Sequence, residues 1–235
     1  MSVLYVFPHP DDESFGPALA IACQRRKGEE VHLLTLTRGG ATKQRHRLGL
    51  TIQEMGQVRL KEMEAMARVL DLTSMEVLDF PDSGLKHLDP RILERAIADH
   101  VRKIRPRVMV TYAVHGVSGF PDHLVSHAVV KRLFCALRDE EPGAAPARLA
   151  LFTLAESDQD DNFVPLKTSP PEDIDCAVEV SREDEEVARR ALDCYETYRE
   201  VIEKADPLGR TGTTVYFELF GESHDPWLGS LTEGL

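Results

Sequence analysis

Two short polar segments contain the residue types that could bind a metal ion and carry out hydrolysis. The first runs from Pro8 to Glu13 and contains one histidine and three carboxylates within five positions. The second is Gly119-Phe120-Pro121-Asp122-His123, with His127 one helical turn further on. Carboxylates packed so closely repel one another unless a cation lies among them. A metal site is therefore one interpretation of the two segments.

Histidine, carboxylate and histidine are a common ligand set for catalytic zinc, because three protein ligands leave the fourth position for water. Zinc lowers the pKa of that water to about 7, which makes hydroxide available at neutral pH. A second carboxylate near the water can then act as a general base. Asp11 and Asp12 are adjacent, so one side chain can point toward the metal and the other toward the water.

Each of these residues also has a simpler interpretation. Any carboxylate of the first segment could cap the helix that follows it, and Asp122 could do the same for the next helix. His123 or His127, taken singly, is more often a partly buried helix residue than a ligand. The residues alone therefore leave both interpretations open.

Alternating strands and helices are expected to position the two segments. Residues 3–7 are a continuous apolar run typical of a buried strand, residues 14–27 have a helical pattern, and residues 31–37 are a second apolar run. This order predicts a parallel pair with a right-handed crossover. Further strands are expected at residues 75–80, 108–112, 148–154 and 213–220, and further helices at 57–70, 89–104, 122–138 and 182–204.

The alternation predicts an α/β fold: a Rossmann-like, doubly wound, mainly parallel sheet with a small C-terminal strand and helix extension. We interpret residues 1–235 as a single domain with a core at 1–155 and an extension at 156–235. Ligands of such sheets bind at the C-terminal ends of the strands, where both polar segments fall. Residues 41–56 and 157–175 are expected to be loops.

The composition of the chain limits which partners and cellular locations are expected. The chain is 42% hydrophobic and 29% charged, as in a globular domain, and its formal net charge of −12 disfavours nucleic acid and anionic lipid as partners. No apolar run approaches the roughly 20 residues that cross a bilayer. With no visible signal peptide and 4 widely spaced cysteines, we expect a cytoplasmic protein with reduced thiols.

The first segment, Pro8-His9-Pro10-Asp11-Asp12-Glu13, resembles the signature of the LmbE/PIG-L family of metal-dependent deacetylases. Weaker resemblances follow in the family's order: a TxG turn at residues 37–40, an RxxE helix at Arg59 and Glu62, a PDG turn at residues 80–84, and the end of an HPDH motif at residues 121–123. The resemblance covers about residues 1–136, and Glu218 and Phe220 are similar to a late ExF strand.

The resemblance implies a reaction and a set of roles. Family members act on N-acetylglucosaminyl compounds, so the expected substrate is a small N-acetylated amino sugar that is hydrolysed to acetate and a free amine. By position, His9, Asp12 and His123 would bind Zn²⁺ or another divalent metal, and Asp11 would be the general base. Arg59 would contribute to substrate binding.

Two further side chains are assigned to the substrate. Asp122 belongs to the second polar segment, and Arg47 to a basic cluster at residues 43–47 that follows the second strand. This cluster is either a solvated loop or, at the mouth of the site, a binding surface for an anionic group of the substrate.

The chain departs from the family pattern at Phe120, where the first histidine of HPDH is usual. That imidazole is expected to be protonated and to stabilise the oxyanion, which phenylalanine cannot do. His115 or His127 could supply the cation instead, and both are taken as candidate catalytic residues. Alternatively, zinc alone suffices, or the chain has lost catalysis and retains metal or sugar binding.

Two other enzyme classes fit less well. A metal-dependent phosphoesterase would need a second metal or more ligands than the sequence offers, and no GxGxxG follows the first strand as a dehydrogenase would need. The sequence leaves open whether the chain forms a homo-oligomer.

Overall fold

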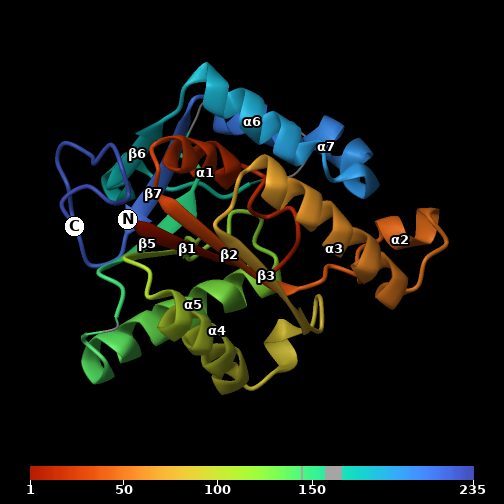
Figure 1. The fold of residues 1–235 in the computed structure, drawn as a ribbon, viewed down its shortest axis with the longest axis horizontal. Helices are drawn as coiled ribbons and strands as arrows, with labels where there is room; N and C mark the ends of the chain where they lie inside the picture. Colours follow the sequence, from red (N-terminus) through yellow and green to blue (C-terminus); the bar gives the residue numbers. More distant parts are fainter. Residues whose placement is uncertain (144, 157–165) are drawn as a thin grey trace.

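A seven-stranded sheet forms the centre of the molecule in the order β3-β2-β1-β4-β5-β7-β6 (Figure 1). The computed structural model describes residues 1–143, 145–156 and 166–235. The strands are β1 (Ser2–Phe7), β2 (Glu30–Thr37), β3 (Ser74–Phe80), β4 (Val108–Tyr112), β5 (Arg148–Thr153), β6 (Cys176–Glu179) and β7 (Thr214–Leu219).

Strands β1 to β5 are parallel, and β7 is antiparallel to both β5 and β6. From β1 the chain adds β2 and then β3 toward one edge of the sheet. It then returns to place β4 on the other side of β1. The topological switch point therefore lies between β1 and β4. This arrangement confirms the predicted mainly parallel α/β fold.

Helices cover both faces of the sheet (Figure 1). One face carries α1 (Pro17–Arg26), α3 (Ile52–Val69) and α6 (Arg182–Leu192), and the other carries α4 (Pro90–Ile104) and α5 (Pro121–Glu140). The shorter elements are α2 (Gln44–Arg47), α7 (Arg199–Ala205), α8 (Pro207–Thr211) and the 3₁₀ turns η1 (Leu85–His87), η2 (Pro171–Asp173) and η3 (Glu196–Tyr198).

Burial on both faces explains the continuous apolar sequence of β1. Val3, Tyr5 and Phe7 belong to the core under α1 and α6, whereas Leu4 and Val6 belong to the core under α4 and α5. Successive side chains of a strand point to opposite faces, so a strand covered on both sides has no solvent-facing position.

The expectation that residues 41–56 form only a loop was wrong. Helix α3 begins at Ile52, and α2 occupies the centre of the basic cluster. The start of α3 is fixed by a capping box, in which the Thr51 side chain accepts from the Glu54 amide and the Glu54 side chain accepts from the Thr51 amide. Of the expected loop at 157–175, residues 157–165 lie outside the described residues.

The helix expected over residues 182–204 is broken into α6, η3 and α7. The break lets the amide and hydroxyl of Thr197 donate to the two carboxylate oxygens of Glu62 on α3, at 2.7 and 2.8 Å. These contacts join residues distant in sequence, so helical periodicity does not predict them. Strand β6 was also not predicted.

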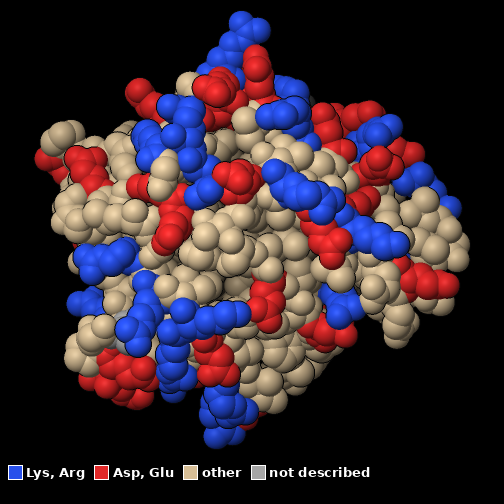
Figure 2. All heavy atoms as spheres, in the orientation of Figure 1, with Lys and Arg blue, Asp and Glu red and all other residues tan. Residues whose placement is uncertain are grey.

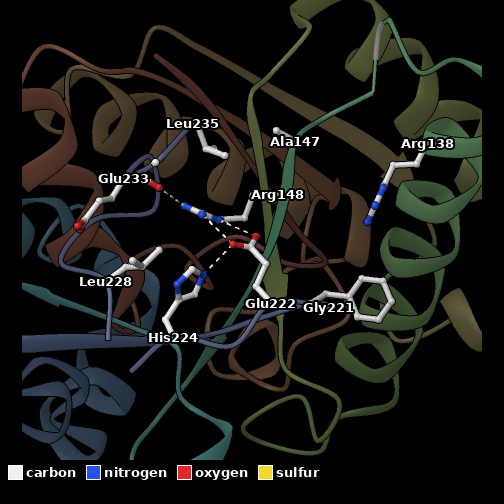
Figure 3. A pocket seen from close by; sticks show the side chains of 11 residues that line it. Arg138, Ala147, Arg148, Gly221, Glu222, His224, Leu228, Glu233 and Leu235 are labelled. Carbon is white, nitrogen blue, oxygen red and sulfur yellow. Dashed lines mark hydrogen bonds and ion pairs between the residues drawn. The ribbon is translucent and has the colours of Figure 1, made fainter. Parts of the chain in front are cut away.

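The buried guanidinium of Arg148, at the start of β5, holds the C-terminal segment (Figure 3). It donates to both carboxylate oxygens of Glu222, each at 2.8 Å, and to the carbonyl oxygens of Leu231 and Glu233. Only the planar, multi-donor guanidinium can satisfy all four acceptors at once.

Charges of both signs are interspersed on the face drawn in Figure 2, with no large area of one sign. None of the helices within residues 1–143, 145–156 and 166–235 is long and apolar enough to cross a bilayer.

The substitution Arg148→Lys is expected to lower the free energy of unfolding by about 1–3 kcal/mol, because a lysine leaves buried acceptors without donors. Arg182→Lys is the control, since the Arg182 side chain is 90% exposed and its ion pair, among the described residues, is with Glu186; it should change stability by less than about 0.5 kcal/mol. Denaturant unfolding measures both, and equal stabilities for the two variants would contradict the assignment.

Candidate metal centre

The loop that follows β1 and the first turn of α5, which follows β4, bring His9, Asp12 and His123 together. The two strands are neighbours in the sheet, so their carboxyl ends open into the same space. One possible ligand atom from each of the three residues lies within 4.8 Å of those of the other two. We call His9, Asp12 and His123 the central cluster.

The distances within the central cluster fit one bound cation. His9 Nδ1 lies 3.5 Å from Asp12 Oδ2, and His123 Nε2 lies 3.3 Å from Asp12 Oδ1. Two atoms that bind one tetrahedral zinc ion at about 2.1 Å are themselves roughly 3.4 Å apart. The carboxylate therefore lies between two imidazole nitrogens at a spacing typical of shared metal ligands.

Neighbouring groups orient both imidazole rings. His123 Nδ1 lies 3.0 Å from the carbonyl oxygen of Gly116, to which it donates, so the lone pair of Nε2 faces Asp12. His9 Nε2 lies 3.4 Å from an oxygen of Asp82 and 3.4 Å from one of Asp122. Metal-binding histidines usually donate their second N–H to a carbonyl or carboxylate in this way.

The central cluster has strong negative potential. Burial lowers the pKa of His9, but hydrogen bonds to Asp12 and Asp122 outweigh it and raise that pKa to about 10. Burial raises the pKa of Asp12, yet the two histidines hold it well below its usual range. Asp122 Oδ1 is buried and has no hydrogen-bond partner among the described residues. The potential that favours a proton on His9 also favours a metal cation.

Asp11 lies beside the central cluster and is held by Arg59. Arg59 Nη2 donates to Asp11 Oδ2 at 2.5 Å and to the Pro10 carbonyl at 2.7 Å, and Arg59 Nη1 donates to the Gly39 carbonyl at 3.2 Å. Burial raises the pKa of Asp11, and the Arg59 guanidinium only partly offsets it. Asp11 is therefore a stronger base than an exposed aspartate.

The backbone of Asp11 has a left-handed conformation with φ of 80°. Non-glycine residues adopt this region rarely, and aspartate tolerates it better than most. The strain turns the Asp11 and Asp12 side chains in different directions, one toward Arg59 and the other toward the histidines. Strained backbone of this kind gathers at functional sites.

The structure does not bring His115 and His127 into the central cluster. His115 Nδ1 accepts from the Val117 amide, and its Nε2 lies 3.2 Å from Ser169 Oγ. His127 Nδ1 donates to the Tyr112 carbonyl at 2.8 Å. Burial lowers the pKa of both histidines, which disfavours the cationic form.

The other predicted positions have distinct surroundings. Arg47 contacts the Thr197 carbonyl and Glu200, and it is not among the described residues that line the cavity. Capping of α5 was one interpretation of Asp122, but Phe120 is the N-cap residue, and the Asp122 carboxylate faces His9. The Phe120 ring is 60% exposed and packs edge-on against His123.

Sequence reasoning missed three residues near the central cluster. Asp82 reaches His9 from the end of β3, the Tyr112 hydroxyl donates to Asp12 Oδ1 at 2.8 Å, and the Tyr198 ring covers the Arg59 guanidinium at 4.2 Å. Asp82 could have been found, because it lies in a turn directly after a predicted strand. The tyrosines carry no such signal.

A cavity of about 660 Å³ opens over the central cluster. Asp11, Arg59 and Asp82 contribute to its wall together with His9, Asp12 and His123. This volume is within the range of small-molecule sites, roughly 300–1,000 Å³.

A sequence model of the GlcNAc-PI de-N-acetylase (PIG-L) family matches residues 4–134. A 1D-myo-inositol 2-acetamido-2-deoxy-alpha-D-glucopyranoside deacetylase of Kineococcus radiotolerans is 34% identical over 173 residues, 62% of this chain and 48% of the relative. A mycothiol S-conjugate amidase of Streptomyces coelicolor is 31% identical over 159 residues, 60% of this chain and 54% of the relative. The chain spans about half the length of these curated relatives.

Solved structures share the fold at lower identity. An N,N'-diacetylchitobiose deacetylase from Pyrococcus horikoshii has a TM-score of 0.70 and 19% identity, covering 93% of this chain and 83% of that one. GalB, the 4-carboxy-2-hydroxymuconate hydratase from Pseudomonas putida, has a TM-score of 0.67 and 18% identity, covering 95% and 97%. Because a hydratase has the same fold, the fold alone does not specify amide hydrolysis.

If His123 is a metal ligand, the substitution His123→Ala should weaken Zn²⁺ binding by more than about 100-fold, because removing a ligand should cost more than the 10–100-fold loss typical of groups that only orient ligands. His127→Ala is the matched control: a buried histidine on the same helix that lies outside the central cluster. Metal content after dialysis, and calorimetric titration with Zn²⁺, measure the difference. Equal zinc binding by the two variants would contradict the assignment.

Proposed function

This chain belongs to the GlcNAc-PI de-N-acetylase (PIG-L) family, and from that premise we propose that it hydrolyses the N-acetyl group of an N-acetylglucosaminyl-type small molecule. The products are acetate and a free amine. The observation that carries the proposal is the juxtaposition of a buried, arginine-held carboxylate, Asp11, with the central cluster in one cavity. The names of the curated relatives, a deacetylase and an amidase, support the same reaction class.

We propose that His9, Asp12 and His123 bind Zn²⁺ or another divalent cation. The spacing of their ligand atoms and the orientation of both rings support this assignment. Sites of this composition accept several divalent metals, and metal availability selects among them. When bound, the cation would supply Lewis-acid polarisation of the acetamide carbonyl and would acidify water.

Asp11 is the proposed general base. Its Oδ2 accepts from Arg59, which leaves Oδ1 to take a proton from water as the water oxygen attacks the carbonyl carbon. The same oxygen then returns the proton to the amide nitrogen, and the C–N bond breaks. Acetic acid and the amine leave, and the acid gives its remaining proton to solvent to become acetate. The raised pKa of Asp11 suits both proton transfers near neutral pH.

We assign Arg59 a positioning role rather than direct contact with substrate. Its two Nη groups donate to Asp11 and to two backbone carbonyls, and the guanidinium lies against the Tyr198 ring, so both Nη groups are directed at the protein. Asp122 orients His9 in the same way. In the family motif a protonated histidine is expected at the position of Phe120. The contacts of His115 and His127 do not support a role for either residue as its replacement.

A homologue that binds metal or sugar without turnover is the second candidate. The observation that favours it is Phe120, whose ring lies against His123 where the resembling motif would place an imidazole. Ligand binding without acetate release across a panel of N-acetylglucosaminyl compounds would favour this candidate over the hydrolase.

The substitution Asp11→Asn is expected to lower kcat for acetate release by about 10²–10⁴-fold, the usual contribution of a general base. Asparagine tolerates the left-handed backbone and keeps the shape, so zinc content should stay at the wild-type level. Asp99→Asn is the control, because its side chain is 76% exposed and lies on α4. Acetate release from N-acetylglucosaminyl-inositol at saturating substrate measures both variants. Wild-type turnover by Asp11→Asn would exclude Asp11 as the base.

A further inference from the structure

The loop at residues 115–119 holds the proposed metal ligand His123 in place. The carbonyl of Gly116 in this loop accepts from His123 Nδ1 at 3.0 Å. A Cβ at Gly116 would come within 2.8 Å of the His123 Cβ, so only glycine lets the backbone approach the ligand this closely. The direction of the His123 ring therefore depends on the backbone conformation of this loop.

Two successive residues of the loop have a left-handed backbone: Gly116, with φ of 65°, and Val117, with φ of 56°. Glycine adopts this region freely, but a β-branched residue such as valine does so only under strain. Strained backbone persists only where surrounding contacts fix it. Here the Val117 amide donates to His115 Nδ1 at 3.0 Å, and the Val117 carbonyl accepts from the Lys167 amide at 2.7 Å. His115 is therefore one of the two residues that hold the strained turn.

His115 connects this turn to β7 through a chain of hydrogen bonds. Because His115 Nδ1 accepts from the Val117 amide, the neutral ring carries its proton on Nε2. This Nε2 lies 3.2 Å from Ser169 Oγ and 3.3 Å from Thr153 Oγ1. The Ser169 hydroxyl in turn donates to Glu218 Oε1 at 2.6 Å. The chain therefore runs in one direction, from the Val117 amide to the Glu218 carboxylate.

The surroundings favour an intact chain. Burial, followed by the nearby Lys167 and His127, lowers the pKa of His115 and so favours the neutral ring, which can accept at Nδ1. Thr153 and Ser169 are buried, and a buried hydroxyl that loses its partner is costly. Both hydroxyls are therefore expected to keep their places in the chain.

We propose that His115, Ser169 and Glu218 are positioning residues, which hold the strained Gly116-Val117 turn so that the Gly116 carbonyl fixes the His123 ring for metal binding. The inference rests on the proposed function, because it takes His123 as a metal ligand. It also connects the metal site to β7, which lies outside the residues 4–134 that the family model matches. His115 thereby acts through the backbone and not as a cation in the reaction.

The substitution His115→Leu tests the near end of the chain, because leucine offers the Val117 amide no acceptor. Zn²⁺ binding should weaken by about 10–100-fold, the loss typical of groups that orient ligands. His115→Asn should restore most of the affinity, since its side-chain oxygen can accept from the amide two residues further on. Calorimetric titration of the metal-free protein with Zn²⁺ measures both variants.

His127→Leu is the matched control, because His127 Nδ1 also bonds to the backbone, at the Tyr112 carbonyl, but lies outside the chain. It should bind Zn²⁺ as the wild type does. Thermal unfolding confirms that the variants fold. Wild-type affinity in folded His115→Leu, or equal losses in His115→Leu and His115→Asn, would overturn the proposal.

The substitution Ser169→Ala tests the far end. It leaves His115 Nε2 only the longer contact with Thr153, so Zn²⁺ affinity should fall about two- to tenfold, the effect of one hydrogen bond. Ser126→Ala is the matched control, since Ser126 is also buried and hydrogen-bonded to a threonine, Thr111. Equal affinities of the two folded variants would overturn the role of Ser169.

Two measurements on the metal-free chain keep the inference separate from the proposed function. Nitrogen-15 NMR should show His115 with its proton on Nε2, and the Val117 amide should exchange with solvent more slowly in the wild type than in His115→Leu. A proton on Nδ1 of His115, or equal exchange rates, would overturn the proposal even for an active enzyme. A wild-type chain that binds no zinc or releases no acetate would instead count against the proposed function.

Discussion

The crowding of carboxylates at the carboxyl ends of the central strands is the constraint on which the site depends. Asp12 and Asp122 are almost fully buried, and Asp82 is within reach of the same imidazole of His9. Burial and mutual repulsion both oppose ionised carboxylates in such a place. The two imidazoles, Arg59 beside Asp11 and the proposed divalent cation together make the arrangement sustainable.

The strand order brings the residues of the site together from distant parts of the chain. Because β1 and β4 are neighbours at the switch point, the loop after β1 and the start of α5 after β4 supply the central cluster from segments far apart in sequence. The strands to either side contribute further lining residues, among them Asp82 after β3 and Phe152 on β5. The C-terminal part of the chain contributes through η3, where Tyr198 covers Arg59 and Thr197 binds Glu62.

The alternation of apolar runs with helical patterns predicted the parallel core well, because strands buried on both faces, such as β1, are continuously apolar. The convergence of His9, Asp12 and His123 was also predictable from strand-end positions and from the resemblance. What could not be predicted depends on contacts distant in sequence. The break in the expected C-terminal helix accompanies donation from Thr197 to Glu62, and the backbone groups of Gly116, Val117 and Tyr112 orient His123, His115 and His127.

Anomalous diffraction at the zinc edge, from crystals of the chain grown with Zn²⁺, tests the central claim most directly. We predict one strong peak within coordination distance of His9, Asp12 and His123. Asp11 should lie nearby, hydrogen-bonded to Arg59 and not coordinated to the metal. A zinc ion bound elsewhere, or a peak that is not bonded to both histidines, would contradict the account.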